Sequence, residues 1–293
     1  GCAPLTRDFI ISNFEANDAS TIYRILPGDG SPEQVFNHPP PAVFTHTYQA
    51  SSCTPDGAAF EFSVFAQNGC ATSRASVAPV RVYAGPQAGI SANAVVCVGQ
   101  PVAFLNQTTL GADNNCSTQT SFNWDFGDGT PVRQTTGSTN PLPSVSHTYT
   151  AAGTYTVTLK TENRSCQGTD ATFQITVIPP AISVFTGGTD QTIKSVPNNP
   201  PTPPELMVAN DGCLPANLDL VNQSLGLVDT TEWRVISGPR DGFLFNSGDT
   251  ISFQNNERLT FSKPGTYLIQ LRVANGCNDS SSVAKVEIKD KPI

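Results

Sequence analysis

The sequence is poor in the residues from which most enzyme and nucleic-acid sites are built. Charged residues make up only 14% of the 293 residues, and the chain holds three histidines and one methionine. No apolar run approaches the roughly 20 residues of a membrane-spanning helix. No Cys-x-x-Cys spacing indicates structural zinc. The net charge of −8 argues against a surface for nucleic-acid phosphates. We therefore expect no nucleic-acid binding and no direct membrane insertion.

The residues that are abundant favour strands and turns. The chain has 23 glycines and 24 prolines, which punctuate turns, among many β-branched residues that suit a pleated sheet. Its eight cysteines have no catalytic neighbours and indicate disulfides, which persist in oxidising compartments outside the cell. No signal peptide is recognisable, so we expect any such segment to have been removed or to lie outside these residues.

The chain repeats itself three times. The middle copy reads Cys97-Val-Gly, Trp124-Asp-Phe-Gly-Asp-Gly, His147-Thr-Tyr, Gly153-Thr-Tyr-Thr-Val-Thr-Leu and Cys166. The last copy reads Cys213-Leu-Pro, Trp233-Arg-Val, Leu259-Thr-Phe, Gly265-Thr-Tyr and Asn275-Gly-Cys277. The first copy reads Cys2-Ala-Pro, Tyr23-Arg-Ile-Leu-Pro-Gly-Asp-Gly, His46-Thr-Tyr and Asn68-Gly-Cys70. Three copies in register exclude coincidence.

Each copy is predicted to be one small sandwich of two sheets. About seven short strands with turn signals every 8–12 residues are typical of an immunoglobulin-like domain. We expect an all-β chain of three tandem sandwiches in an end-to-end rod, with domains at 1–85, 86–179 and 180–293. The first domain diverges and its first strand is expected to be missing, and the third has insertions at 190–210 and 237–256. Predicted core residues are Trp124, Trp233, Tyr155 and Tyr267.

These motifs resemble the polycystic-kidney-disease (PKD) family. The Trp124-Asp-Phe-Gly-Asp-Gly, His147-Thr-Tyr and Gly153-Thr-Tyr segments match its signature well, whereas the first and third copies depart from it. The cysteine-bearing form is similar to repeats of large Bacteroidetes surface proteins, including gliding-motility adhesins exported by type IX secretion. The resemblance implies a cell-surface location and a role in adhesion, spacing or contact with carbohydrate or protein.

The cysteines allow two pairing schemes. In a stacked array of such sandwiches, turns at facing ends meet, which predicts Cys53–Cys116, Cys2–Cys166 and Cys97–Cys277 as bonds between domains. Cys53–Cys116 is expected in either case, and pairing of the repeated cysteines within each copy gives Cys2–Cys70, Cys97–Cys166 and Cys213–Cys277 instead of the last two bonds. A strand of about eight residues separates those turns by roughly 26 Å, whereas a disulfide needs Cα atoms within about 7 Å. We favour the first scheme, with Cys70 and Cys213 awaiting neighbouring domains, and leave the second open.

Several side chains invite a chemical role. Asp125 and Asp128 are candidate ligands of a weak calcium site, and Asp113 is a poorer one; the alternative for Asp128 is capping of its own turn. For His46 and His147 we expect a hydrogen-bonded structural role. Phe243 and Phe245 indicate either a contact loop or a tucked-in hairpin. Residues 198–204 predict a polyproline excursion. Thr230 and Thr250 resemble Bacteroidetes O-glycosylation sites.

The sequence contains neither a nucleophile motif nor a pair of carboxylates expected to share a cleft, so nothing in it points to catalysis. We therefore expect a non-enzymatic extracellular stalk of a large adhesin or filament, without a cofactor unless the calcium site is real. Its partners would be neighbouring repeats and a surface polysaccharide or another cell-surface protein. The alternative is a carbohydrate- or protein-binding module accessory to a secreted hydrolase.

Overall fold

The computed structural model describes residues 1–53, 59–188, 196–197, 205–206 and 214–290. In these ranges the chain forms strands, turns and loops but no α-helix, and so no helix of the length and apolarity of a membrane span. The chain forms two compact units. One holds residues 1–93, 101–147 and 155–175, and the other holds residues 94–100, 148–154 and 176–293. The middle copy of the repeat therefore contributes to both units.

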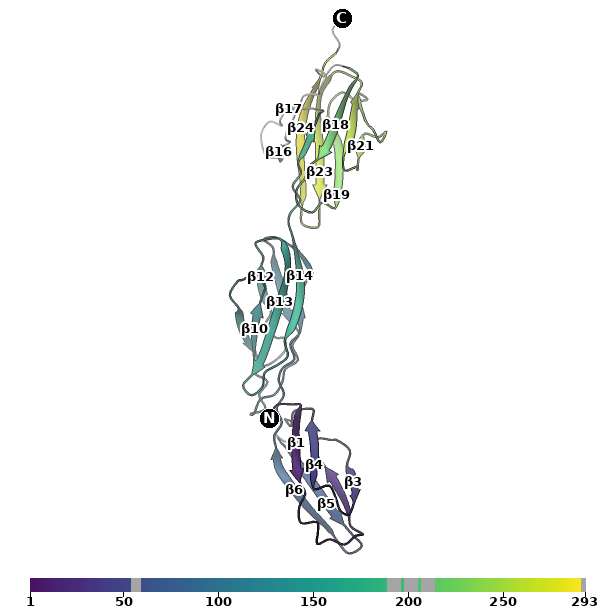
Figure 1. The fold of residues 1–293 in the computed structure, drawn as a ribbon. Helices are drawn as coiled ribbons and strands as arrows, with labels where there is room; N and C mark the ends of the chain where they lie inside the picture. The colour runs from purple at the N-terminus through teal and green to yellow at the C-terminus, as the bar shows by residue number, and fades with distance from the viewer. Residues whose placement is uncertain (54–58, 189–195, 198–204, 207–213, 291–293) are drawn as a thin grey trace. The chain divides into compact units, whose positions relative to one another are not determined.

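The named strands form six sheets, two for each copy of the repeat (Figure 1). In the first repeat, one sheet is β1 (Leu5–Ile10) and β4 (Val43–Tyr48). The other runs β3 (Gln34–Asn37), β2 (Ile22–Leu26), β5 (Phe60–Gln67) and β6 (Thr72–Val80).

The second repeat has a larger set of strands around the same plan. One sheet runs β12 (Val145–Thr148), β9 (Pro101–Asn106) and β7 (Ile90–Ser91). The other runs β11 (Arg133–Gly137), β10 (Thr120–Asp125), β13 (Gly153–Asn163), β14 (Ala171–Ile178) and β8 (Val95–Cys97). Strand β8 lies parallel to β14, and the pairs of β10 with β11 and β13 are antiparallel.

The third repeat again has two sheets. One runs β15 (Phe185–Gly187), β18 (Ala216–Asn222), β22 (Glu257–Phe261) and β20 (Phe243–Phe245). The other runs β16 (Val196–Pro197), β24 (Asp279–Ile288), β23 (Gly265–Ala274), β19 (Thr230–Ser237) and β21 (Ile251–Ser252), with β17 (Glu205–Leu206) also beside β24.

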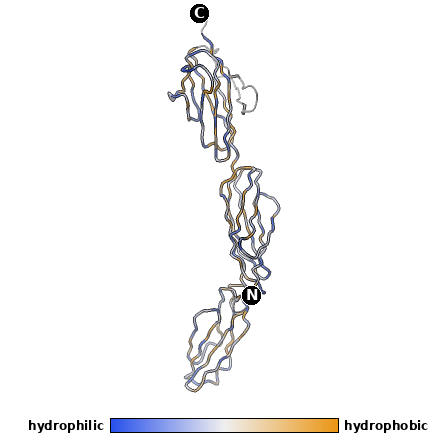
Figure 2. Tube along the Cα trace, turned by 180° about the vertical axis from the view of Figure 1, so that it is seen from behind, coloured by the Kyte–Doolittle hydropathy of each residue, from blue (hydrophilic) through white to orange (hydrophobic). Residues whose placement is uncertain are grey.

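Each repeat buries alternate residues of its strands between the two sheets. Strand β9 alternates exposed and buried positions along its whole length, as a strand with one face on a core must. Hydrophobic and hydrophilic segments correspondingly alternate along the traced chain (Figure 2). The all-β class of tandem immunoglobulin-like sandwiches is thereby confirmed, whereas the boundaries expected at 85 and 179 stay predictions.

Large aromatic side chains fill the interiors. Trp124 and Trp233 are fully buried, and the ring centroid of Trp233 lies 5.1 Å from that of Phe185 in an edge-on contact. In the first repeat Tyr23 and Ile25 of β2 are buried instead. Burial of one such side chain contributes about 2–3 kcal/mol, so each indole is a principal support of its sandwich.

The two tyrosines predicted for the core differ in burial. Tyr267 is fully buried, but Tyr155 is only partly covered, which corrects its assignment as a core residue. The reason is the insertion of the third repeat. Its Phe243 ring packs edge-on against Tyr267 at 6.1 Å, and the Tyr267 hydroxyl donates to the carbonyl of Gly242 at 3.1 Å.

The same insertion corrects the expectation of a contact loop. Phe243 and Phe245 lie in β20, which pairs antiparallel with β22, and Phe245 is 1% exposed. The two rings face the core because β20 extends the sheet over Tyr267. The tucked-in alternative therefore describes this segment, and the hypothesis of an aromatic contact patch there is wrong.

Candidate functional site

Three disulfides join cysteines of neighbouring repeats. Cys2–Cys166 and Cys53–Cys116 bond the first repeat to the second, with Cα atoms 5.8 and 5.4 Å apart. Cys97–Cys277 bonds the second repeat to the third, with Cα atoms 5.5 Å apart. These are the three bonds of the scheme between domains, and none of the bonds proposed within a copy is formed by these six residues. Cys70 is exposed and free, as that scheme expects, and Cys213 lies outside the described residues.

The linker between the first two repeats, residues 84–89, is itself paired with the second repeat. The amide of Ala84 donates to the carbonyl of Ala112 at 2.9 Å, and Ala112 returns a bond at 3.0 Å. Gln87 exchanges two similar bonds with Thr109, at 2.8 and 2.9 Å. Backbone pairing fixes the linker against the second repeat, because each of these residues is held in an extended conformation.

Glycine permits this close backbone approach. A Cβ atom at Gly111 would lie 2.1 Å from the carbonyl oxygen of Ala84, which no side chain could accommodate without moving the backbone. The third repeat has an equivalent approach, since a Cβ atom at Gly226 would lie 2.3 Å from the carbonyl oxygen of Pro180. The linker preceding each of these repeats is thus pressed against the repeat that follows it.

One asparagine ties the linker to the turn that holds the disulfide. The side-chain amide of Asn163 donates to the carbonyl of Ala84 at 2.7 Å. Its Oδ1 atom accepts the backbone amides of Ser165 at 3.0 Å and Cys166 at 2.8 Å. A single side chain therefore fixes both the turn that holds Cys166 and the path of the linker at Ala84.

The same device recurs in the third repeat. Asn275 donates to the carbonyl of Pro179 at 3.0 Å, and its Oδ1 atom accepts the amide of Cys277 at 2.8 Å. In the first repeat Asn68 holds the turn of Cys70 in the same way, at 2.9 Å. Sequence reasoning missed this role. The signal was present, because an asparagine lies two or three residues before each of these cysteines.

The histidines of the His-Thr-Tyr segments bond to the Gly-Asp-Gly turn. His147 Nε2 lies 2.7 Å from Asp128 Oδ2, and the His147 ring stacks on Phe126 with centroids 4.0 Å apart. The first repeat repeats the pair as His46 and Asp29, at 2.8 Å. Partners of this kind, partly buried beside a core ring, are what a structural role requires.

Asp128 is bound on both of its oxygens. Its Oδ1 atom accepts the amide and the hydroxyl of Thr130, at 3.1 and 2.6 Å. Partial burial raises the pKa of Asp128, but the hydrogen bonds from Thr130 and His147 together outweigh burial and lower the pKa below its ordinary value. The carboxylate is thus held ionised as the anchor of its turn.

The comparisons can now be set beside this geometry. Residues 83–177 match the family model described as the PKD domain. A single solved PKD domain, from an M14-like peptidase of Thermoplasmatales archaeon SCGC AB-540-F20, is 20% identical over 32% of this chain and 95% of that one, with a TM-score of 0.27.

Longer arrays of immunoglobulin domains align with nearly the whole chain. The N-terminal eight domains of Down Syndrome Cell Adhesion Molecule are 13% identical, with a TM-score of 0.56, over 98% of this chain and 35% of that one. The titin I-band fragment I67-I69 is 12% identical, with a TM-score of 0.44, over 98% of this chain and 94% of that one. At such identities, the likeness shows the fold alone.

The candidate calcium ligands of the second repeat are engaged in turns. Asp125 Oδ1 accepts the amide of Gly127 at 2.9 Å. Asp113 is 3% exposed, and its Oδ1 atom accepts the amides of Asn115 and Ser117 at 2.8 and 2.9 Å. Across the described ranges no three His, Cys, Asp or Glu residues cluster as metal ligands would. Calcium binding by Asp125 and Asp128 stays a prediction.

The remaining candidates lie in the third repeat. Thr230 at the start of β19 and Thr250 before β21 are both exposed, so a modifying enzyme could reach either hydroxyl. Their O-glycosylation stays a prediction. The polyproline segment at 198–204 falls outside the described residues. The residues that the structure does bring together are those of the junctions, and these form the candidate functional site.

Proposed function

We propose that this chain is a non-catalytic, extracellular segment of a surface stalk, in which disulfides lock neighbouring repeats together. The observation that carries the proposal is the junction of the first and second repeats. The linker at 84–89, the Cys2–Cys166 bond and the Cys53–Cys116 bond give it three covalent connections. A single linker would allow the two sandwiches to swing and twist. Three connections that enter at different turns oppose both motions.

The disulfides also support the location. Such bonds form and persist in oxidising surroundings, whereas the cytosol keeps thiols reduced. The loop of 63 residues that Cys53–Cys116 closes is worth about 4 kcal/mol to the folded state by the chain-entropy model. An extracellular chain of three small sandwiches gains this stability at the point where a pulling or bending force would act.

The parent protein fits the same proposal. A large adhesin or filament of the Bacteroidetes type, exported by type IX secretion, would use such a segment to project a binding tip. Its partners would be further repeats of the same kind and a polysaccharide or protein on another surface. The PKD match of residues 83–177 supports the kind of module.

The test compares the orientation of the first two repeats with and without their bonds. Residual dipolar couplings measured on the oxidised chain give an alignment tensor for each repeat. Rigidly joined repeats share one tensor, and that is the expected result. In the control with Cys2, Cys53, Cys116 and Cys166 all replaced by serine, the tensors should diverge in magnitude. Divergent tensors in the oxidised chain itself would refute the locked stalk.

A further inference from the structure

Two of the three asparagines that shape the cysteine turns are followed by glycine. The segments are Gln67-Asn-Gly-Cys70 and Ala274-Asn-Gly-Cys277, and they contain the two Asn-Gly sequences of the whole chain. Asn163 is followed by Arg164 instead. In an Asn-Gly sequence the backbone nitrogen of the glycine can attack the side-chain amide of the asparagine, because glycine has no Cβ atom to shield that nitrogen or to restrict the backbone.

Both turns hold the side-chain oxygen in a way that favours this attack. The Oδ1 atom of Asn68 accepts the backbone amides of Cys70 and Ala71, at 2.9 and 3.1 Å. The Oδ1 atom of Asn275 accepts two backbone amides at 2.8 and 3.1 Å. When a nucleophile adds to the Cγ atom, negative charge develops on this oxygen, and two fixed amide donors stabilise that charge. The two sites therefore do not differ at the atom that is attacked.

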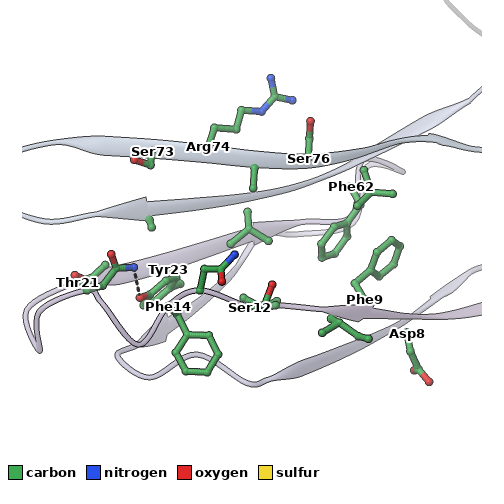
Figure 3. A pocket seen from close by; sticks show the side chains of 18 of the residues that line it. Asp8, Phe9, Ser12, Phe14, Thr21, Tyr23, Phe62, Ser73, Arg74 and Ser76 are labelled. Carbon is green, nitrogen blue, oxygen red and sulfur yellow. Dashed lines mark hydrogen bonds between the residues drawn. The ribbon is translucent and has the colours of Figure 1, made fainter.

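The turn of the first repeat is open to water. Gly69 is exposed, and apart from its chain neighbours no heavy atom of the described residues lies within 4 Å of the place of a Cβ atom there. Asn68 lines an open groove of about 900 Å³ in the first repeat. Figure 3 shows Ser73 on one wall of this groove and Thr21 on the other. Water therefore reaches the nitrogen of Gly69 and the side-chain amide of Asn68.

The two turns differ in how the side-chain nitrogen is held. The Nδ2 atom of Asn275 donates to two backbone carbonyls, that of Pro179 at 3.0 Å and that of Leu227 at 2.8 Å. The Nδ2 atom of Asn68 donates once, to Asp18 Oδ2 at 2.9 Å. Asp18 is exposed, so water competes for this bond. The amide must turn its Cγ atom toward the glycine nitrogen and then lose Nδ2, and both steps break fewer hydrogen bonds at Asn68 than at Asn275.

We propose that Asn68 is a site of spontaneous deamidation and that the turns of Asn163 and Asn275 are protected from it. The nitrogen of Gly69 forms a bond to Asn68 Cγ, its proton passes through solvent to Nδ2, and the Cγ–Nδ2 bond breaks with loss of ammonia. Water then opens the succinimide ring at either carbonyl, which yields aspartate or isoaspartate. Either product places a second carboxylate beside Asp18 in place of a donor, and so loosens the turn. This inference does not depend on the proposed stalk function.

The experiment follows the three asparagines in one oxidised full chain kept at neutral pH. Peptide mapping by mass spectrometry measures the deamidated fraction at each site over time, and enzymatic methylation counts the isoaspartate. We expect Asn68 to deamidate at least about fivefold faster than Asn275, because at least one further hydrogen bond must break at Asn275. Asn163 should stay unmodified over the same period. In the matched control Gly69→Ala, deamidation of Asn68 should slow by at least about tenfold, with the rate at Asn275 unchanged.

The same chain unfolded in urea with reductant separates the effect of the fold from that of the sequence. There the two Asn-Gly-Cys sequences should deamidate at equal rates, because both have lost their turns. If Asn68 still reacts faster in the unfolded chain, the sequence and not the turn determines the difference, and the proposal is overturned. Equal rates at Asn68 and Asn275 in the folded chain, or no product at Asn68, also overturn it. An undiminished rate in Gly69→Ala overturns the attack by the backbone nitrogen.

Discussion

The connectivity of the disulfides predicts how far the unfolded chain can be stretched. Without its bonds, the chain of 293 residues extends to about 1,000 Å at about 3.5 Å per residue. With them, the shortest covalent route crosses Cys2–Cys166, returns along the chain to Cys97 and crosses to Cys277. That route contains about 85 residues and extends to about 300 Å.

Removal of one bond gives a sharper prediction. If Cys2 and Cys166 are both replaced by serine, the route crosses Cys53–Cys116 instead and again contains about 85 residues. The extended length should therefore stay at about 300 Å. Pairing within each copy would lose two bonds in this variant, and its route of about 165 residues would extend to about 580 Å.

The assay is single-molecule pulling between handles at Gly1 and Ile293, read as the final extended length. Reductant serves as the control and should release the chain to about 1,000 Å. A variant that also lacks Cys53–Cys116 should extend to about 390 Å, since only the Cys97–Cys277 bond still shortens it. A length near 580 Å for the variant lacking Cys2 and Cys166 would refute the bonding between repeats.

Further predictions concern the turns and the linker. Asn163→Asp loses the hydrogen-bond donor to the Ala84 carbonyl and should lower the free energy of unfolding of the oxidised chain by about 1–2 kcal/mol in urea. An unchanged free energy of unfolding would show that this hydrogen bond does not hold the linker. The pKa of Asp128 is lowered by folding, so its contribution is complete above about pH 4 and is lost as pH falls through the folded pKa. In Asp128→Asn the urea midpoint should fall less steeply as the pH drops below about 4. The same pH dependence as in the unsubstituted chain would contradict a stabilising bond between His147 and Asp128. Gly127→Ala, with φ +74° and a Cβ atom 2.5 Å from the Thr156 carbonyl, should lower the melting temperature more than Gly129→Ala, which has φ +82° and open space. Equal losses of melting temperature in the two variants would show that the positive φ, and not the space around the Cβ atom, determines the loss of stability.

The sequence contained enough to predict the fold and the cysteine pairing. Period-two alternation around Trp124 and Trp233 defines half-buried strands, and three copies in register define three sandwiches. The pairing between repeats was favoured, with the pairing within copies left open, from the stacking of facing turns and from one length. A strand of about eight residues separates the turns of Cys97 and Cys166 by roughly 26 Å, too far for a bond within the copy. A distance that depends only on the number of residues in a strand can be derived from the sequence without coordinates.

What the sequence could not specify depends on contacts between distant residues. The aromatic pair Phe243 and Phe245 is equally apolar in an exposed loop and in a strand, and only the position of Tyr267 decides between them. Asn163 contacts Ala84, which is 79 residues away, so no local pattern predicts the bond. Tyr155 fits the core pattern of β13, but nothing in its own repeat corresponds to the insertion that covers Tyr267.

The differences among the copies separate what the repeat needs inside from what it needs at its ends. The third copy replaces the histidine of His147-Thr-Tyr with Leu259 and lacks the Gly-Asp-Gly turn, yet Leu259 is fully buried and the sandwich forms. Apolar packing can thus substitute for the histidine–aspartate pair. The asparagine that shapes the cysteine turn recurs in all three copies, and in two of them it also holds the linker. A domain that needed only to fold would retain the histidine–aspartate pair and vary the asparagine of the cysteine turn. This chain does the reverse, which supports the proposed role of the junctions between its repeats.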